Sequence, residues 1–235
     1  MATHRWEPCQ LQSRSSLWLA WPRSPDGMST HRDQRTSSSG EKSDNRYSGL
    51  ILGPIPGALL RVLTSPDLTL EPQTATHAGE MFVVLSDPAI YEYENAPPPS
   101  VEWLRSRYAR LESRRSPDSA EQWLNWVIRL PGDELIGYVQ ATVREGGMAA
   151  IAYVLSSAYW GRGLASQATE AMITELAERY SVSALTAVLK RQNQRSMRML
   201  ERLGFDIASP GQHLDYRVQT DEQLLYRPLH KARSN

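Results

Sequence analysis

Residues 149–165 read AAIAYVLSSAYWGRGLA, and this stretch decides the fold of the chain. The apolar run over Met148–Leu155 predicts a strand, and Gly161 and Gly163 predict a turn after it. The turn leads directly into an amphipathic helix predicted over Ala165–Tyr180. Exposed N–H groups at a helix start, with glycines that let a ligand approach the backbone, form an anion site, usually a phosphate site.

Two common phosphate motifs fit this turn poorly. Residues 161–166 read GRGLAS and begin like a dinucleotide-binding fingerprint, but Ser166 stands where the third glycine belongs. No Gly-Lys-Ser/Thr sequence follows, which excludes a P-loop. The turn alone could also be a plain connection between a strand and a helix. A second segment argues against that simpler interpretation.

Residues 193–205 form this second segment and read NQRSMRMLERLGF. Asn193 is the predicted N-cap of a helix to Leu203, and Gly204 is the predicted left-handed residue after it. Together the two segments resemble the cofactor half of the GNAT superfamily of acetyl-CoA-dependent N-acetyltransferases. The most similar branch is that of the ribosomal-protein N-terminal acetyltransferases (RimJ/RimL-like). Trp160 stands where many members have Gln or Arg, and this branch tolerates a Tyr-Trp-Gly-x-Gly turn.

The resemblance implies that acetyl-CoA is the co-substrate, with its pyrophosphate on the N–H groups of the turn. The pantetheine arm would pair with the strand near Val154 and Leu155, which must then splay from the strand predicted over residues 185–190; family members achieve this with a bulge. Asn193 and Ser196 fall on family positions that face the pantetheine and the thioester. The cofactor residues assigned in this way are Val154, Leu155, Trp160, Gly161, Arg162, Gly163, Leu164, Ala165, Asn193 and Ser196. Arg162 could instead be solvated, and Asn193 could be an N-cap only.

The implied reaction is attack of an amine on the thioester carbonyl, with a backbone N–H near Val154 or Leu155 as the oxyanion donor. Many relatives carry a tyrosine as general acid seven residues after the motif asparagine, where this chain has Leu200. Ser196 is the catalytic residue we assign in its place, as a donor to the departing thiolate.

The general base is not identified by the sequence. Relatives often carry a glutamate where this chain has Ala150 and Ile151. The remaining candidates are Glu92, Glu94 and Glu134, each of which could equally be a solvated surface carboxylate. An α-amino group is roughly 10–20% neutral at pH 7, whereas a lysine is neutral at below roughly 0.1%. A site without a dedicated base therefore favours a protein N-terminal amine as the acceptor.

The acceptor side is predicted to form from the loop Ile90–Ala96 and the helix after Ser100. Tyr91 and Tyr93 in this loop could receive a cationic amine, or could simply pack the loop onto the core. Two other functions stay open: acetylation of a small amine such as an aminoglycoside or polyamine, and acyl-CoA binding without turnover.

Composition limits the remaining function classes. The 235 residues carry 26 Lys and Arg against 26 Asp and Glu, so charge gives no argument for nucleic acid or an anionic membrane as partner. The single cysteine, Cys9, suits a reducing compartment, and no apolar run approaches the roughly 20 residues of a membrane helix. These features predict a cytoplasmic protein. The histidines His77, His213 and His230 show no metal-ligand spacing, and no metal is expected.

The first 56 residues differ from the rest of the chain. Ser29–Gly49 is almost free of aliphatic residues and predicts a disordered tail, with translation starting at Met1 or at Met28. Residues 57–232 are predicted to form one GNAT domain of the α/β (α+β) class, a mixed, mostly antiparallel sheet flanked by helices. The expected strands are 68–72, 123–130, 135–143, 148–155, 185–190 and a closing pair at 214–218 and 223–228. The expected helices are 75–85, one that begins after Ser100, 165–180 and 193–203.

Overall fold

The computed structural model describes residues 60–93 and 96–229 of the chain. The chain divides into two units, Met1–Leu52 and Gly53–Asn235, and every described residue belongs to the second unit. The tail predicted over residues 1–56 lies outside the described residues and stays a prediction.

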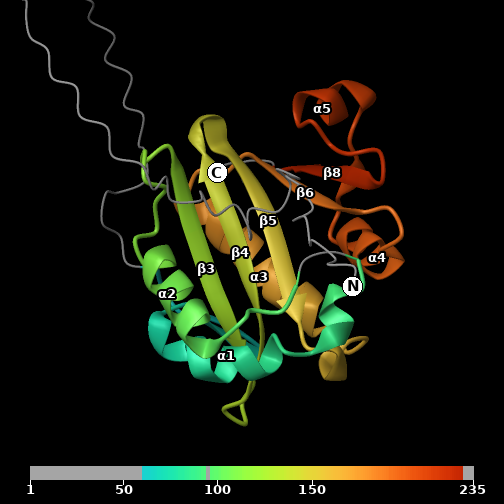
Figure 1. Ribbon diagram of the computed structural model, residues 1–235. Coiled ribbons are helices and arrows are strands. Elements are labelled where there is room, and N and C mark those ends of the chain that lie inside the picture. The colour runs from blue at the N-terminus through green and yellow to red at the C-terminus, as the bar shows by residue number, and fades with distance from the viewer. Residues whose placement is uncertain (1–59, 94–95, 230–235) are drawn as a thin grey trace, which may run out of the picture. The chain divides into compact units, whose positions relative to one another are not determined.

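An eight-stranded sheet forms the centre of the second unit, in the order β1-β2-β3-β4-β5-β6-β8-β7 (Figure 1). All neighbouring strands are antiparallel except β5 and β6, which run parallel. The strands are β1 (Leu63–Ser65), β2 (Leu68–Pro72), β3 (Glu121–Arg129), β4 (Leu135–Arg144), β5 (Met148–Leu155), β6 (Ala184–Lys190), β7 (Asp206–Ile207) and β8 (Glu222–Pro228). The predicted mixed, mostly antiparallel sheet is confirmed.

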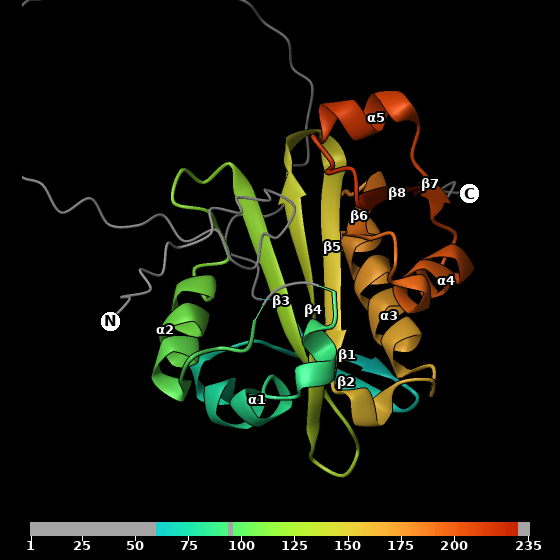
Figure 2. The same ribbon diagram turned by 45° about the vertical axis from the view of Figure 1, so that its right-hand side comes forward.

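Helices cover both faces of this sheet. The α-helices are α1 (Ala78–Val84), α2 (Val101–Leu111), α3 (Leu164–Arg179), α4 (Gln194–Arg202) and α5 (Pro210–Asp215). Short 3₁₀ helices are η1 (Ala75–His77), η2 (Pro88–Tyr91), η3 (Glu145–Gly147) and η4 (Ser157–Tyr159). Helices α1 and α2 lie on one face of the sheet, and α3 lies on the other (Figures 1 and 2). The predicted helix over residues 75–85 therefore begins with a 3₁₀ turn.

Local sequence signals explain where several elements begin. Ser100 is the N-cap of α2, because its hydroxyl accepts a hydrogen bond from the Trp103 N–H at 3.2 Å. Leu104 and Tyr108 of this helix are buried. Strand β5 has the bounds that its apolar run predicted.

The main core lies between the sheet and the layer of α3 and α4. Met172 and Leu176 of α3 and Leu200 of α4 belong to one buried cluster with Trp126 of β3. The indole N–H of Trp126 donates to the Arg61 carbonyl at 2.9 Å, so its one polar atom is satisfied. This packing holds α3 and α4 against the sheet.

Strands β5 and β6 pair only at one end and then separate. Their register joins Met148–Ala150 to residues 184–186 and does not continue to Leu155. The predicted splay is confirmed, but β4 and β5 stay in continuous register, so the expected bulge is not found between these two strands. Gly137 of β4 allows the close approach, because a Cβ there would overlap the Val154 carbonyl.

The strand predicted over residues 214–218 is wrong. Residues 210–215 form α5, and β8 pairs with β6 and with the two-residue β7 instead. Ser209 and Gln212 form a capping box, and Pro210 occupies the first turn, where its missing N–H has no cost. These start signals outweigh the strand-like pattern after them.

Within the described part of the chain, no helix is long and apolar enough to cross a membrane. The same residues contain no group of three or more His, Cys, Asp or Glu that could hold a metal ion.

Candidate active site

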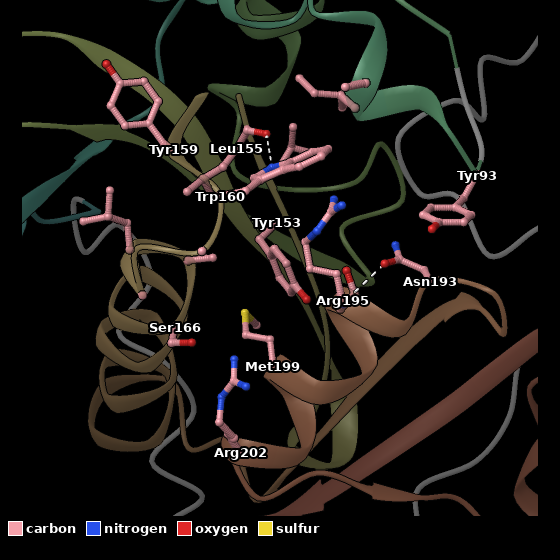
Figure 3. A pocket seen from close by; sticks show the side chains of 18 residues that line it. Tyr93, Tyr153, Leu155, Tyr159, Trp160, Ser166, Asn193, Arg195, Met199 and Arg202 are labelled. Atoms are coloured by element: carbon pink, nitrogen blue, oxygen red, sulfur yellow. Dashed lines mark hydrogen bonds between the residues drawn. The ribbon is translucent and has the colours of Figure 1, made fainter. Parts of the chain in front are cut away.

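A pocket of about 220 Å³ opens where β5 ends, beside the start of α3 and one face of α4 (Figure 3). A third wall comes from η2 and the loop after it. The lining residues are Ala89, Ile90, Tyr93, Tyr153, Val154, Leu155, Tyr159, Trp160, Gly161, Gly163, Leu164, Ala165, Ser166, Asn193, Arg195, Ser196, Met199 and Arg202. No described carboxylate lines it, and two arginines do, so the pocket suits an anionic ligand.

The turn before α3 has the geometry of an anion site. Gly161 and Gly163 have φ values of +76° and +78°, in the left-handed region that favours glycine. A Cβ added at Gly163 would meet nothing within 4 Å, so the space over the turn is open. The N–H groups of Leu164, Ala165 and Ser166 begin the helix and have no intrahelical acceptor. These donors and the helix dipole favour a negative group here.

Two side chains connect opposite walls of the pocket. The Trp160 indole N–H donates to the Leu155 carbonyl at 3.0 Å, which fixes the ring over the end of β5. The Arg195 guanidinium of α4 stacks on this ring, 3.7 Å from its centroid. Arg162 does not line the pocket; it lies 5.1 Å from the Tyr159 ring centroid. Of the ten residues assigned to the cofactor, Arg162 alone lies outside the lining.

Helix α4 presents the start of its polar face to the pocket. The Asn193 Oδ1 accepts a hydrogen bond from the Ser196 N–H at 3.1 Å, so the predicted N-cap is confirmed. Both side chains also line the pocket, and the two interpretations of Asn193 are therefore compatible. Leu200 is buried in the core.

Tyr153 contributes a hydroxyl that the sequence interpretation did not assign. Its ring projects from β5 into the pocket toward α4 (Figure 3). The hydroxyl is buried and makes no hydrogen bond with any residue that the structure describes. Burial raises the pKa of Tyr153 to about 12, although Ser196 and the charge of Arg202 offset part of this effect. The hydroxyl therefore stays protonated at neutral pH.

The acceptor loop is partly placed at the pocket. Ile90 and Tyr93 line it, whereas the Tyr91 hydroxyl donates to the Leu85 carbonyl at 2.7 Å and packs the loop onto α1. Desolvation and a hydrogen bond to Glu92 raise the pKa of Tyr93.

The three carboxylates considered as bases receive no support from this arrangement. Glu92 and Glu134 are exposed and do not line the pocket, and Glu134 accepts a hydrogen bond from the Tyr159 hydroxyl. Glu94 lies outside the described residues.

Sequence reasoning missed part of the lining, including Tyr153, Ser166, Arg195, Met199 and Arg202. The helical spacing of the sequence contained a signal for two of them, Met199 and Arg202. Met199 and Arg202 continue the three-residue spacing of Asn193 and Ser196, which keeps side chains on neighbouring positions of one helix face. The inward direction of Tyr153 was not readable, because both faces of β5 are apolar.

Comparison with known proteins agrees with this geometry. The family model described as "Acetyltransferase (GNAT) domain" matches residues 67–206, which is more than half of the chain. RimL, a ribosomal L7/L12 α-N-protein acetyltransferase solved in complex with coenzyme A, superposes with a TM-score of 0.61 at 17% identity, covering 73% of this chain and 100% of that chain. The Vibrio fischeri ribosomal-protein-S5-alanine acetyltransferase gives a TM-score of 0.58 at 16% identity, covering 72% of this chain and 96% of that one.

An acetyltransferase from Thermus thermophilus gives a TM-score of 0.55 at 23% identity, covering 69% of this chain and 97% of that chain. At such identities these structures show a shared fold, which includes the sheet and the helix layers described above. The matched residues include the turn, β5 and all of α4. The chain therefore belongs to the GNAT acetyltransferase family and is an acyltransferase.

Proposed function

We propose that this protein transfers the acetyl group of acetyl-CoA to a primary amine, and that the acceptor is a protein N-terminal α-amine. The observation that carries the proposal is one pocket that joins the glycine turn at the start of α3 to the Asn193–Ser196 face of α4. The choice of acceptor follows the resemblance to the ribosomal-protein branch. It is supported by the structural neighbours of this chain, which include the two ribosomal-protein acetyltransferases named above.

The cofactor would enter as a pyrophosphate followed by an extended arm. The N–H groups of residues 161–165 would hold the pyrophosphate, since the space beside Gly161 and Gly163 is open and the turn leads into the start of α3. The arm would lie in the gap that opens where β5 leaves β6 after Ala150. The thioester would then lie beside Asn193 and Ser196, at the far end of the arm.

The chemical step is attack of a neutral amine on the thioester carbon, with the C–S electron pair leaving on sulfur. Ser196 donates a hydrogen bond to that sulfur, and a backbone N–H near Val154 stabilises the oxyanion. The lining contains no described carboxylate that could serve as a base. An acceptor with a substantial neutral fraction at pH 7 is therefore favoured, and an α-amine of pKa about 7.7–8.0 meets this condition.

Other parts of this proposal rest on the sequence. A cytoplasmic location follows from the lone cysteine, and no metal is needed for the step described. Small amines stay the second acceptor class, because Tyr93 lines the pocket and could receive a cationic amine of either kind.

A panel of acceptors tests the proposal. Acetyl-CoA is incubated with matched peptides: one with a free N-terminus and no lysine, one N-terminally blocked with a single lysine, and a set of polyamines and aminoglycosides. We expect thiol release and a mass gain of one acetyl group on the free N-terminus, and the lysine peptide should react far more slowly. Transfer to the small amines alone would overturn the α-amine assignment. Tight CoA binding with no transfer to any acceptor would support a binding module instead.

A further inference from the structure

The Tyr153 hydroxyl has hydrogen-bonding capacity that the described part of the chain leaves unused. It is buried, it faces the pocket, and none of the described residues bonds to it. A buried hydroxyl without a partner is destabilising, so native proteins rarely keep one without water or a ligand to satisfy it. Its position in the lining makes the bound ligand the natural partner.

The neighbours of Tyr153 indicate which part of the ligand it meets. Ser196 is close enough to influence its pKa, and Arg202 adds a positive charge from the same face of α4. Tyr153 also lies beyond Ala150, the last residue of β5 that pairs with β6, so its side chain borders the gap between the strands. Both features place the hydroxyl near Ser196, beside the gap between β5 and β6.

We propose that Tyr153 is a catalytic hydrogen-bond donor to the thioester sulfur, acting beside Ser196. This inference rests on the proposed acetyl transfer. As the amine nitrogen bonds to the acetyl carbon and the C–S bond breaks, the electron pair moves to sulfur, and the Tyr153 O–H bonds to the thiolate. The amine proton goes to solvent, and the released thiolate later takes a proton from solvent.

Tyr153 keeps its own proton throughout this step. A thiol has an ordinary pKa of about 8.5, whereas burial raises the pKa of Tyr153 to about 12. Proton transfer from the phenol to the thiolate is therefore unfavourable, while a hydrogen bond between them is charge-assisted. Tyr153 thus differs from a general acid: it lowers the pKa of the leaving thiol without changing its own protonation state.

The pKa of the CoA thiol in the binary complex tests this role without turnover. The ultraviolet absorbance of the thiolate is titrated with CoA bound to the wild-type chain, to Tyr153→Phe and to Tyr180→Phe. Tyr180 is the matched control, because it is also a buried tyrosine but caps the far end of α3. We expect the bound thiol pKa to rise by about one unit in Tyr153→Phe, for a loss of one charge-assisted hydrogen bond. It should be unchanged in Tyr180→Phe.

Two further measurements separate this role from a structural one. Desulfo-CoA, which lacks the sulfur, should bind Tyr153→Phe and the wild type equally, and kcat with acetyl-CoA should fall about tenfold to a hundredfold with little change in acetyl-CoA affinity. An unchanged thiol pKa in Tyr153→Phe, with normal desulfo-CoA binding, would overturn the inference and leave the proposed function intact. Weakened desulfo-CoA binding would overturn it too, by assigning Tyr153 a structural role. Failure of CoA to bind the wild type would overturn the proposed function itself.

Discussion

Gly163 both sets the backbone conformation of the turn and borders the proposed phosphate site. It is the N-cap of α3 with φ +78° and open space over its Cα. In Gly163→Val the side chain occupies the space assigned to the pyrophosphate, so we expect acetyl-CoA binding to fall below detection. The left-handed backbone should also cost about 1–2 kcal/mol of stability.

Gly204→Val is the control for that strain. Gly204 has φ +76° after α4 and does not line the pocket. Calorimetric titration of both variants and thermal melts compare the two effects. We expect both variants to lose a similar amount of stability and only Gly163→Val to lose CoA binding. This result would support the phosphate site at the turn. Normal binding by a folded Gly163→Val would exclude the turn as the phosphate site.

Ser196 allows a second test at the level of one side chain. Its N–H, not its hydroxyl, bonds to Asn193, so Ser196→Ala keeps the N-cap of α4. We expect kcat to fall roughly tenfold to a hundredfold while acetyl-CoA affinity and melting temperature stay close to wild type. Full kcat in this variant would end the catalytic assignment of Ser196.

The role of a single residue in the site could be predicted from the sequence where few residue types can fill that role. The glycines of the turn and the Asn193 cap could be read because left-handed backbone and N-caps each favour a short list of residues. The roles of Tyr153 and Arg195 could not be predicted in this way, because tyrosine and arginine occur in many structural and functional settings. Their positions depend on the distance between β5 and α4, which only the folded chain sets.

The segment before β1 is tied to α3 mainly by the ion pair of Arg61 with Glu175. Arg61 donates to Glu175 at 2.6 Å, and Glu175 is 2% exposed. Arg61→Ala leaves a buried carboxylate without its main partner, so we expect a clearly lower melting temperature. Glu178→Ala is the control, because Glu178 is exposed and lies 3.7 Å from the same guanidinium; its loss should change little. Equal melting temperatures for both variants would contradict this view of the pair.

A truncated chain that begins at Leu59 keeps Arg61 and should keep both the melting temperature and acetyl-CoA binding of the full chain. This result is expected because Ser29–Gly49 lacks residues that could add to a core. Thermal melts and calorimetry on the two chains make the comparison. A large loss of either property would show that the first 58 residues contribute to the domain.

Elements with strong periodicity were predicted well, and short ones were not. The run Met148–Leu155 is long and apolar, so its strand has the predicted bounds. Residues 214–218 were assigned to a strand because the capping box of α5 was not recognised. The two-residue β7 is too short to leave a pattern in the sequence.

For the molecule as a whole, buried tyrosines predict how stability depends on alkaline pH. Burial raises the pKa of Tyr91 and of Tyr153 to about 12, and it also raises the pKa of Tyr108. The unfolded chain ionises these groups near pH 10, so their contribution is complete below about pH 10 and is lost as the pH rises toward 12. We expect buried phenolates to appear together with loss of circular dichroism. Titration of all ten tyrosines near pH 10 in a folded chain would contradict this expectation.

The arrangement of the sheet shows the limit of sequence reasoning at this scale. Local patterns predicted most strands, and the splay of β5 from β6 was predicted from the resemblance of residues 149–165 and 193–205 to a family. The order β5-β6-β8-β7 was not predicted. Periodicity says which residues form a strand and does not say which strands become neighbours.

A crystal structure of the full chain with acetyl-CoA is the most direct test of the central claim, that the pocket between β5 and α4 holds this cofactor. We expect pyrophosphate oxygens on the N–H groups of residues 161–165, the arm in the gap between β5 and β6, and the sulfur beside Tyr153 and Ser196. A cofactor bound elsewhere, or a pyrophosphate remote from the turn, would contradict it.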